Sequence, residues 1–92
     1  MMIEKTKIYN RLNKAAVTKH VENIRNLDDA GKLELCGVFK GYPGVAGMFI
    51  LKTESREEAE AICKDEPLVA GGFATYKLID FQIANKDNNY LL

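Results

Sequence analysis

The chain has 92 residues, in which 13 Lys plus Arg balance 13 Asp plus Glu beside a single histidine. Separate cores rarely form far below about 100 residues, so the length predicts one domain over residues 1–92 with one small hydrophobic core. The balanced charge lacks the basic surface typical of proteins that bind nucleic acids or anionic membranes. We therefore expect neither of those partners.

The apolar segments are short. The longest run, VAGMFIL at residues 45–51, is far below the roughly 20 residues that cross a bilayer. The first residues, MMIEKTKIYNRLNK, lack the apolar region and cleavage site of a secretory signal. These features predict a soluble, cytoplasmic protein.

The two cysteines lie far apart, each inside an apolar periodic segment. Cys36 and Cys63 therefore form no CxxC motif and are interpreted as reduced, buried thiols. A closed zinc site needs four closely spaced N or S ligands, which one histidine and two distant cysteines do not supply. We predict no metal and no cofactor.

The first predicted elements are a strand and a helix. Residues 2–9, MIEKTKIY, alternate imperfectly between apolar and charged side chains and are predicted as a strand. Asn13 is a suitable N-cap for a helix of about four turns, and Gly31 is typical of the residue that follows a helix. The apolar stripe of this helix consists of Val17, Val21, Ile24 and Leu27.

The middle of the chain predicts a hairpin. KLELCGVFK at 32–40 alternates, GYPG has turn chemistry, and VAGMFILK at 45–52 is apolar enough to be covered on both faces. In the first strand, the alternation places Leu33, Leu35 and Phe39 on one side, opposite Glu34, Cys36 and Val38.

The last third predicts one helix and one strand. Ser55 and Glu58 form a capping-box pattern at the start of a helix over 55–64. Pro67 cannot extend that helix, and after a glycine pair FATYKLIDFQI at 73–83 has strand composition. The final nine residues, ANKDNNYLL, show no firm period, although their apolar end favours either fraying or contact with a neighbouring subunit.

The order of elements is β-α-β-β-α-β. This order is the split βαβ arrangement of the α+β, ferredoxin-like fold, an antiparallel sheet with two helices on one face. The other face is left without a cover, and a second copy would bury it. We expect a homodimer with a cavity that suits a small-molecule ligand.

His20 is the first candidate site residue. It lies three residues after Val17 and four before Ile24, so it belongs to the apolar side of the helix. Two interpretations remain open: a packed helix-border histidine, or a histidine beside a pocket that a carboxylate tunes as a general acid or base.

Asp65 and Glu66 are the candidate partners of that histidine. They end the second predicted helix, just before Pro67. The helix macrodipole disfavours carboxylates at a C-terminus, so the pair indicates either full solvation or a specific role. A histidine base needs such a carboxylate to fix its tautomer.

The motifs together resemble the family of small YciI-like proteins. His20 is followed after ten residues by GKLELCG at 31–37, similar to that family's Gly-[KR]-L-x-x-x-G segment. SREEAEAICKDEPLVAGG resembles its S-x-E-E-A motif with the Asp-Pro and glycine region that follows. The resemblance covers residues 17–83.

The resemblance implies a dimeric α/β barrel with an active site centred on a His-Asp pair. The family that the chain resembles includes a dehydrochlorinase that acts on a chlorinated hydroxyquinol. Carried over, His20 takes the histidine position and Glu66 or Asp65 the acid position. We expect proton transfer on a small cyclic or aromatic substrate, in the manner of a dehydrochlorinase, lyase or isomerase, with Tyr42 as a possible ligand contact. The alternative is a non-catalytic module for ligand binding or dimerisation.

Overall fold

The computed structural model describes residues 1–92 and contains one four-stranded antiparallel sheet. The elements follow the order β1 (Met2–Lys5), η1 (Tyr9–Arg11), α1 (Lys14–Asp29), β2 (Leu33–Val38), β3 (Val45–Leu51), α2 (Arg56–Asp65), α3 (Pro67–Ala70), β4 (Ala74–Lys77) and η2 (Lys86–Leu91). The strands lie side by side in the order β2-β3-β1-β4. The predicted ferredoxin-like βαββαβ fold is confirmed.

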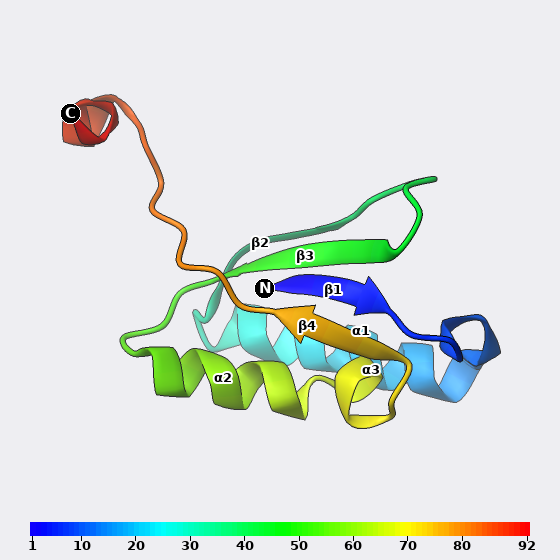
Figure 1. The fold of residues 1–92 in the computed structure, drawn as a ribbon. Coiled ribbons are helices and arrows are strands. Elements are labelled where there is room, and N and C mark those ends of the chain that lie inside the picture. Colours follow the sequence, from blue (N-terminus) through cyan, green and yellow to red (C-terminus); the bar gives the residue numbers. More distant parts are fainter.

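All three α-helices pack on one face of the sheet (Figure 1). Asn13 caps α1 by accepting a hydrogen bond from the Ala16 amide at 2.8 Å, and Ser55 caps α2 through the Glu58 amide at 3.1 Å, both at the predicted positions. The Glu58 side chain does not complete a capping box and instead pairs with Lys32, 2.8 Å away. This pair raises the pKa of Lys32.

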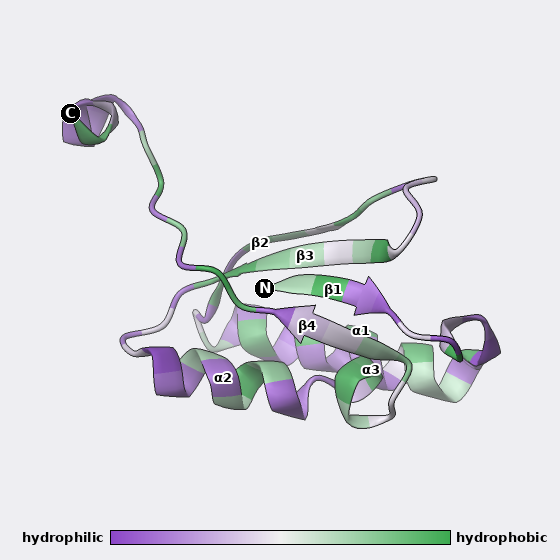
Figure 2. Ribbon diagram, in the orientation of Figure 1, coloured by the Kyte–Doolittle hydropathy of each residue, from purple (hydrophilic) through white to green (hydrophobic).

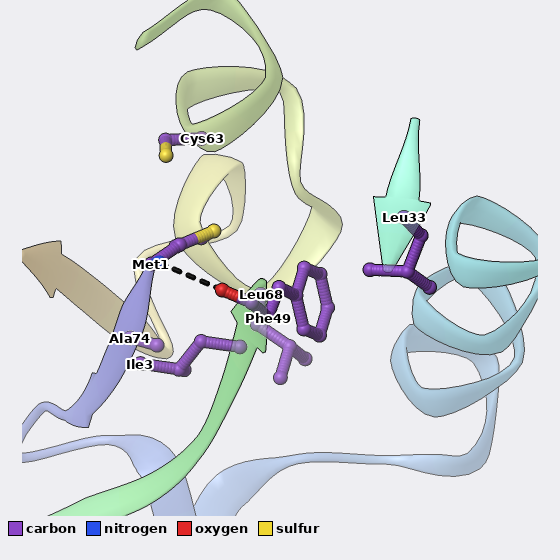
Figure 3. Close-up of a cluster of buried hydrophobic side chains, with 7 residues drawn as sticks. All are labelled: Met1, Ile3, Leu33, Phe49, Cys63, Leu68 and Ala74. Carbon is purple, nitrogen blue, oxygen red and sulfur yellow. Dashed lines mark hydrogen bonds between the residues drawn. The ribbon is translucent and has the colours of Figure 1, made fainter. Parts of the chain in front are cut away.

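The core lies between the sheet and the helices (Figure 3). The seven buried residues of this cluster are Met1, Ile3, Leu33, Phe49, Cys63, Leu68 and Ala74. The Met1 amino group donates to the Phe49 carbonyl at 2.8 Å, and burial lowers the pKa of that amine. No helix is both long and apolar enough to span a bilayer.

The first and last strands along the chain, β1 and β4, are shorter than predicted. β1 ends at Lys5 rather than residue 9, where the chain turns and the Thr6 hydroxyl donates to the Gly72 carbonyl at 2.7 Å. β4 ends at Lys77 rather than residue 83, because β1 is its only partner and the pairing stops at Met2. The strand pairing, not local composition, sets both ends.

The predicted alternation of β2 is wrong between Leu33 and Leu35, which lie on opposite faces of the sheet rather than on the same side. The register between β2 and β3 shifts between Leu33 and Leu35, as at a β-bulge. Leu33 is buried, but Leu35 is 55% exposed on the far face, and Cys36 takes the place opposite Phe49 on the helix-covered face. The bulge thus brings a cysteine to the face on which the helices pack.

β2 and β3 approach each other closely at two glycines. A Cβ atom at Gly47 would overlap the carbonyl oxygen of Gly37 on the neighbouring strand. Gly47 therefore fits only as glycine, and the close approach forms the strand-side wall of the cavity described next.

Candidate functional site

His20 lies on the side of α1 that faces the sheet. Its side chain is 19% exposed, and its ring stacks on Phe49 of β3 with ring centroids 6.0 Å apart and an interplanar angle of 21°. The aromatic contact holds the imidazole at the border of the core. The helical spacing therefore predicted its direction correctly.

Glu66 is the buried partner of His20. Its side chain is 0% exposed, and its Oε1 atom hydrogen bonds to His20 Nδ1. Its Oε2 atom accepts from the backbone amides of Leu68 at 2.8 Å and Val69 at 3.3 Å. Both carboxylate oxygens are thus engaged, which meets the requirement that a buried charge be hydrogen bonded.

The backbone explains how Glu66 reaches this place. Pro67 ends α2 and opens the short helix α3, for which Glu66 is the N-cap. The residue therefore faces free amides at a helix start, where a negative charge is favoured. The expectation that this carboxylate sits unfavourably at a helix C-terminus is wrong, because a second helix begins directly after it.

The hydrogen bond to Glu66 fixes what His20 can do. A carboxylate only accepts hydrogen bonds, so the Nδ1 atom that contacts it carries the hydrogen. The other nitrogen, Nε2, then holds the free lone pair and makes no hydrogen bond within the chain. The arrangement leaves Nε2 as the ring nitrogen that can accept a proton.

A small cavity of about 90 Å³ adjoins the imidazole. Its lining is mostly apolar and consists of Ile3, Tyr9, His20, Ile24, Cys36, Gly37, Val38, Ala46, Gly47, Phe49 and Leu68. For comparison, an apolar cavity of about 150 Å³ can hold a benzene molecule. The cavity is therefore large enough to hold one edge of a single ring, and the rest of that ring would lie outside it.

A second cavity, of about 340 Å³, lies between the end of β3, the start of α2 and residues 78–81. Two of its charged side chains are paired with each other: Arg56 contacts Asp80 at 3.3 Å and also donates to the Leu78 carbonyl at 3.1 Å. It is larger but holds no histidine. Chemistry, rather than size, makes the His20 cavity the candidate site.

Near this second cavity, Tyr76 donates a hydrogen bond to Glu60, and this bond raises the pKa of Tyr76 to about 12. Cys63 is buried at 0% exposure beside the same cluster, and burial raises the pKa of its thiol. Both groups are therefore neutral near pH 7. No group of three or more His, Cys, Asp or Glu side chains is arranged to hold a metal ion.

The predicted site residues divide into two groups. His20 and Glu66 meet, whereas Asp65, the last residue of α2, is exposed and makes no hydrogen bond through its side chain. Tyr42 is 61% exposed in the turn between β2 and β3 and is absent from the cavity lining. The structure thus distinguishes the two carboxylates that the sequence left open.

Apart from His20, the residues that line the cavity were not identified as site residues from the sequence. Tyr9 comes from η1, which was predicted as part of a strand, and Cys36 reaches the cavity only because of the β-bulge. Phe49 was assigned to a strand but not to the site. No local signal identifies these contacts, because each depends on pairing between distant segments.

Comparison with known proteins places this chain in a family. No curated protein matches the chain in sequence. Among solved structures, the 5-chloro-2-hydroxyhydroquinone dehydrochlorinase TftG from Burkholderia phenoliruptrix AC1100, in complex with 2,5-dihydroxybenzoquinone, matches with a TM-score of 0.64. The identity is 13% over 97% of this chain and 100% of that chain, so the match shows a shared fold. The YCII-related domain model matches residues 1–82, and the chain therefore belongs to the YCII-related family.

Proposed function

We propose that this protein is an enzyme that transfers a proton on a small cyclic substrate, with His20 as the base and Glu66 as the residue that orients it. The hydrogen bond between His20 Nδ1 and the fully buried Glu66 carries this proposal. A buried carboxylate with both oxygens engaged is a fixed support for an imidazole rather than a solvated charge.

In the proposed reaction, His20 Nε2 removes a proton from a carbon or hydroxyl of the ring. The substrate reacts as its keto tautomer, in which the ring carbon that carries the leaving group is tetrahedral, so the released electron pair forms a ring double bond at that carbon and expels a leaving group such as chloride. Glu66 stabilises the imidazolium that forms, through the Nδ1 hydrogen bond. The imidazolium then returns its proton to water or to the leaving group.

The cavity supports a planar ligand. Phe49 stacks beside His20, and the lining is mostly hydrophobic, with Tyr9 as one of its few residues that carry a polar group. A ring can stack on aromatic side chains while its oxygens meet such polar groups. The fold shared with a dehydrochlorinase solved with a dihydroxybenzoquinone supports the same class of ligand.

The test uses two probes. 5-Chloro-2-hydroxyhydroquinone is supplied as substrate with chloride release as the readout, and 2,5-dihydroxybenzoquinone is titrated while the amide resonances of Phe49 and Leu68 are followed by NMR. We expect chloride release with the wild type and a loss of about 10²- to 10⁴-fold in His20→Ala, as for a general base.

Two carboxylate variants provide matched controls. Glu66→Gln removes the charge beside His20 and should lower kcat strongly, whereas Asp65→Asn alters the exposed neighbour and should leave kcat near the wild-type value. Circular dichroism and melting curves verify that each variant is folded. Equal losses in both variants would reject the assignment of Glu66.

The competing function is a binding module without catalysis, and the small volume of the cavity favours it. Saturable binding of 2,5-dihydroxybenzoquinone at the cavity, with no turnover of the chlorinated probe, would support this alternative. Binding and turnover both absent would reject a ring-shaped ligand of this class.

We also propose that the protein forms a homodimer. The sheet face opposite the helices, called the open face here, carries Met2, Leu35, Met48 and Ile50 and has no helix against it (Figure 1). The two methionines face each other across β1 and β3. Burial of this face against a second copy would add apolar burial that a 92-residue chain lacks. Light scattering should give twice the monomer mass, and Ile50→Asp should reduce it to one.

A further inference from the structure

The proposed reaction puts negative charge on an oxygen of the substrate ring. When His20 removes a proton next to a ring carbonyl, part of the electron pair moves onto that carbonyl oxygen before the leaving group departs. Glu66, whose side chain is 0% exposed, already holds a negative charge on the Nδ1 side of the imidazole. A second negative charge in a mostly apolar cavity needs a donor or a cation close by. The His20–Glu66 pair does not supply that group.

Tyr9 carries the only hydroxyl among the side chains that line the His20 cavity. The thiol of Cys36 is the other side-chain donor of this lining beside the imidazole, and a thiol is a weak donor. The Tyr76 hydroxyl is bound to Glu60, whereas the Tyr9 hydroxyl makes no hydrogen bond within the chain. Tyr9 is therefore free to donate a hydrogen bond to a ligand.

The turn after β1 fixes the backbone of Tyr9. The Tyr9 amide donates to the Thr6 carbonyl at 3.1 Å, and the Tyr9 carbonyl accepts from the Leu12 amide at 3.1 Å. Thr6 is in turn held by the segment before β4, because its hydroxyl donates to the Gly72 carbonyl at 2.7 Å and its amide to the Phe73 carbonyl at 3.2 Å. This short, hydrogen-bonded segment connects β1 to α1 (Figure 1) and keeps Tyr9 at the cavity.

The ammonium group of Lys5 lies over the ring of Tyr9. Lys5 ends β1, at the point where the strand changes from hydrophobic to hydrophilic (Figure 2), and its Nζ atom is 5.1 Å from the ring centroid. Alternate residues of a strand share a face, so Lys5 lies on the same face as Ile3, which lines the cavity. Glu4, between them, pairs with Lys77 at 3.7 Å, but no carboxylate of the chain pairs with Lys5. One unpaired positive charge thus lies beside Tyr9.

We propose that Tyr9 and Lys5 bind the negatively charged oxygen of the substrate ring. Tyr9 donates the hydrogen bond, and Lys5 is a positioning residue that holds the Tyr9 ring and supplies positive charge. The assignment rests on the proposed function and adds the class of substrate, which is a ring that carries an ionised oxygen, such as an enolate or a hydroxyquinone. Neither residue forms a covalent bond or gives up its proton, since His20 takes the proton and the leaving group takes the electron pair.

Chloride release from 5-chloro-2-hydroxyhydroquinone tests the hydroxyl of Tyr9. Tyr9→Phe keeps the aromatic ring under Lys5 and removes only the donor, so kcat should fall by about 10²-fold, with a smaller change in KM. Lys5→Gln should lower kcat by about fivefold, as expected for one partly solvated charge, and Lys5→Arg should restore it because an arginine also binds an aromatic face. Lys7→Gln, an exposed lysine in the same turn, should match the wild type.

Binding of two rings of the same size separates charge recognition from a general change in the site. 2,5-Dihydroxybenzoquinone is an anion at neutral pH, and hydroquinone, kept under nitrogen, is neutral. Lys5→Gln should raise the Kd of the anion by about fivefold and leave the Kd of hydroquinone unchanged. An equal loss for both ligands would mean that Lys5 only shapes the cavity, and would reject its role in binding charge. Melting curves verify that each variant is folded.

The outcomes distinguish this assignment from the proposed function. If His20→Ala abolishes chloride release while Tyr9→Phe and Lys5→Gln keep wild-type kcat and anion binding, the assignment is rejected and the role of His20 stands. If the chain binds the quinone without turnover, the selectivity for the anion and its loss in Lys5→Gln decide the assignment. A wild-type chain that neither binds nor converts these probes rejects both proposals.

Discussion

Two polar clusters lie on the helix side of the sheet, and they differ in burial and in whether a polar group is left without a partner. The buried cluster consists of His20 and Glu66, and the surface cluster consists of Arg56, Glu60, Tyr76 and Asp80. The surface cluster has more charges and adjoins the larger cavity. Its charges satisfy one another, whereas the buried cluster leaves one imidazole nitrogen free beside an apolar cavity. An imidazole nitrogen without a hydrogen-bond partner beside an apolar cavity, rather than a large number of charges, therefore identifies the candidate site.

Removal of one carboxylate from each cluster, Glu66 or Glu60, should give the largest difference in stability between the two clusters. Glu66→Ala takes away the cap of α3 and leaves the buried His20 nitrogen and two amides without a partner. We expect a loss of about 2–3 kcal/mol in the free energy of unfolding, measured with urea. Glu60→Ala, in the half-exposed cluster, should lose less than about 1 kcal/mol. Similar losses would show that burial does not separate the two clusters.

The two cysteines report on the same contrast through their accessibility. Cys36 lines the His20 cavity and is partly exposed, while Cys63 is fully buried beside the surface cluster, where burial raises the pKa of its thiol. Because the thiolate is the reactive form, iodoacetamide at pH 8 should label Cys36 at least about tenfold faster than Cys63. Mass spectrometry of digested peptides gives the two rates. Faster labelling of Cys63 would mean that this part of the core opens readily.

The pH dependence of stability gives a further test of the surface cluster. The hydrogen bond to Glu60 raises the pKa of Tyr76 to about 12, above the value of about 10 for a free phenol. The folded state therefore keeps this proton longer than the unfolded state, and the associated stability is complete below pH 10. It is lost as the pH rises from 10 to 12. Ultraviolet titration should show one phenol near pH 12 that disappears in Tyr76→Phe.

The smallest expected effect concerns Arg56. Its ion pairs with Asp80 and Glu60 are largely exposed, so Arg56→Ala should change stability by less than about 1 kcal/mol. Salt should weaken the wild type toward the variant, since exposed charges are screened. Thermal melts at low and at 0.5 M salt check this. A salt-independent difference would instead indicate that the hydrogen bond to the Leu78 carbonyl dominates.

The element order could be predicted because its signals are local. Asn13 and Ser55 cap their helices within three residues of sequence, and the apolar periods give the direction of His20. The strand ends could not be predicted from local signals, since β4 stops where β1 offers no further residue to pair with. The register shift in β2 likewise depends on the neighbouring strand.

For the same reason, the position of His20 in the candidate site could be predicted from the sequence, but its carboxylate partner and the cavity lining were not. Helical spacing directs His20 inward, but it does not say which carboxylate meets it. A usable signal was present in Glu66 and Pro67, since an acceptor followed by proline is typical of a helix start. That pattern predicts α3 and thereby selects Glu66 over Asp65. Cys36 and Tyr9 carry no such signal, because their places depend on long-range pairing.

The close approach of β2 and β3 at Gly37 and Gly47 constrains any redesign of this protein for other substrates. No side chain can be introduced at residue 47 without displacing the neighbouring strand. Residue 47 in the strand-side wall of the cavity must therefore remain glycine. Libraries aimed at new ring sizes should instead vary the helix-borne lining residues, Ile24 and Leu68, where shorter side chains enlarge the space and leave the sheet intact.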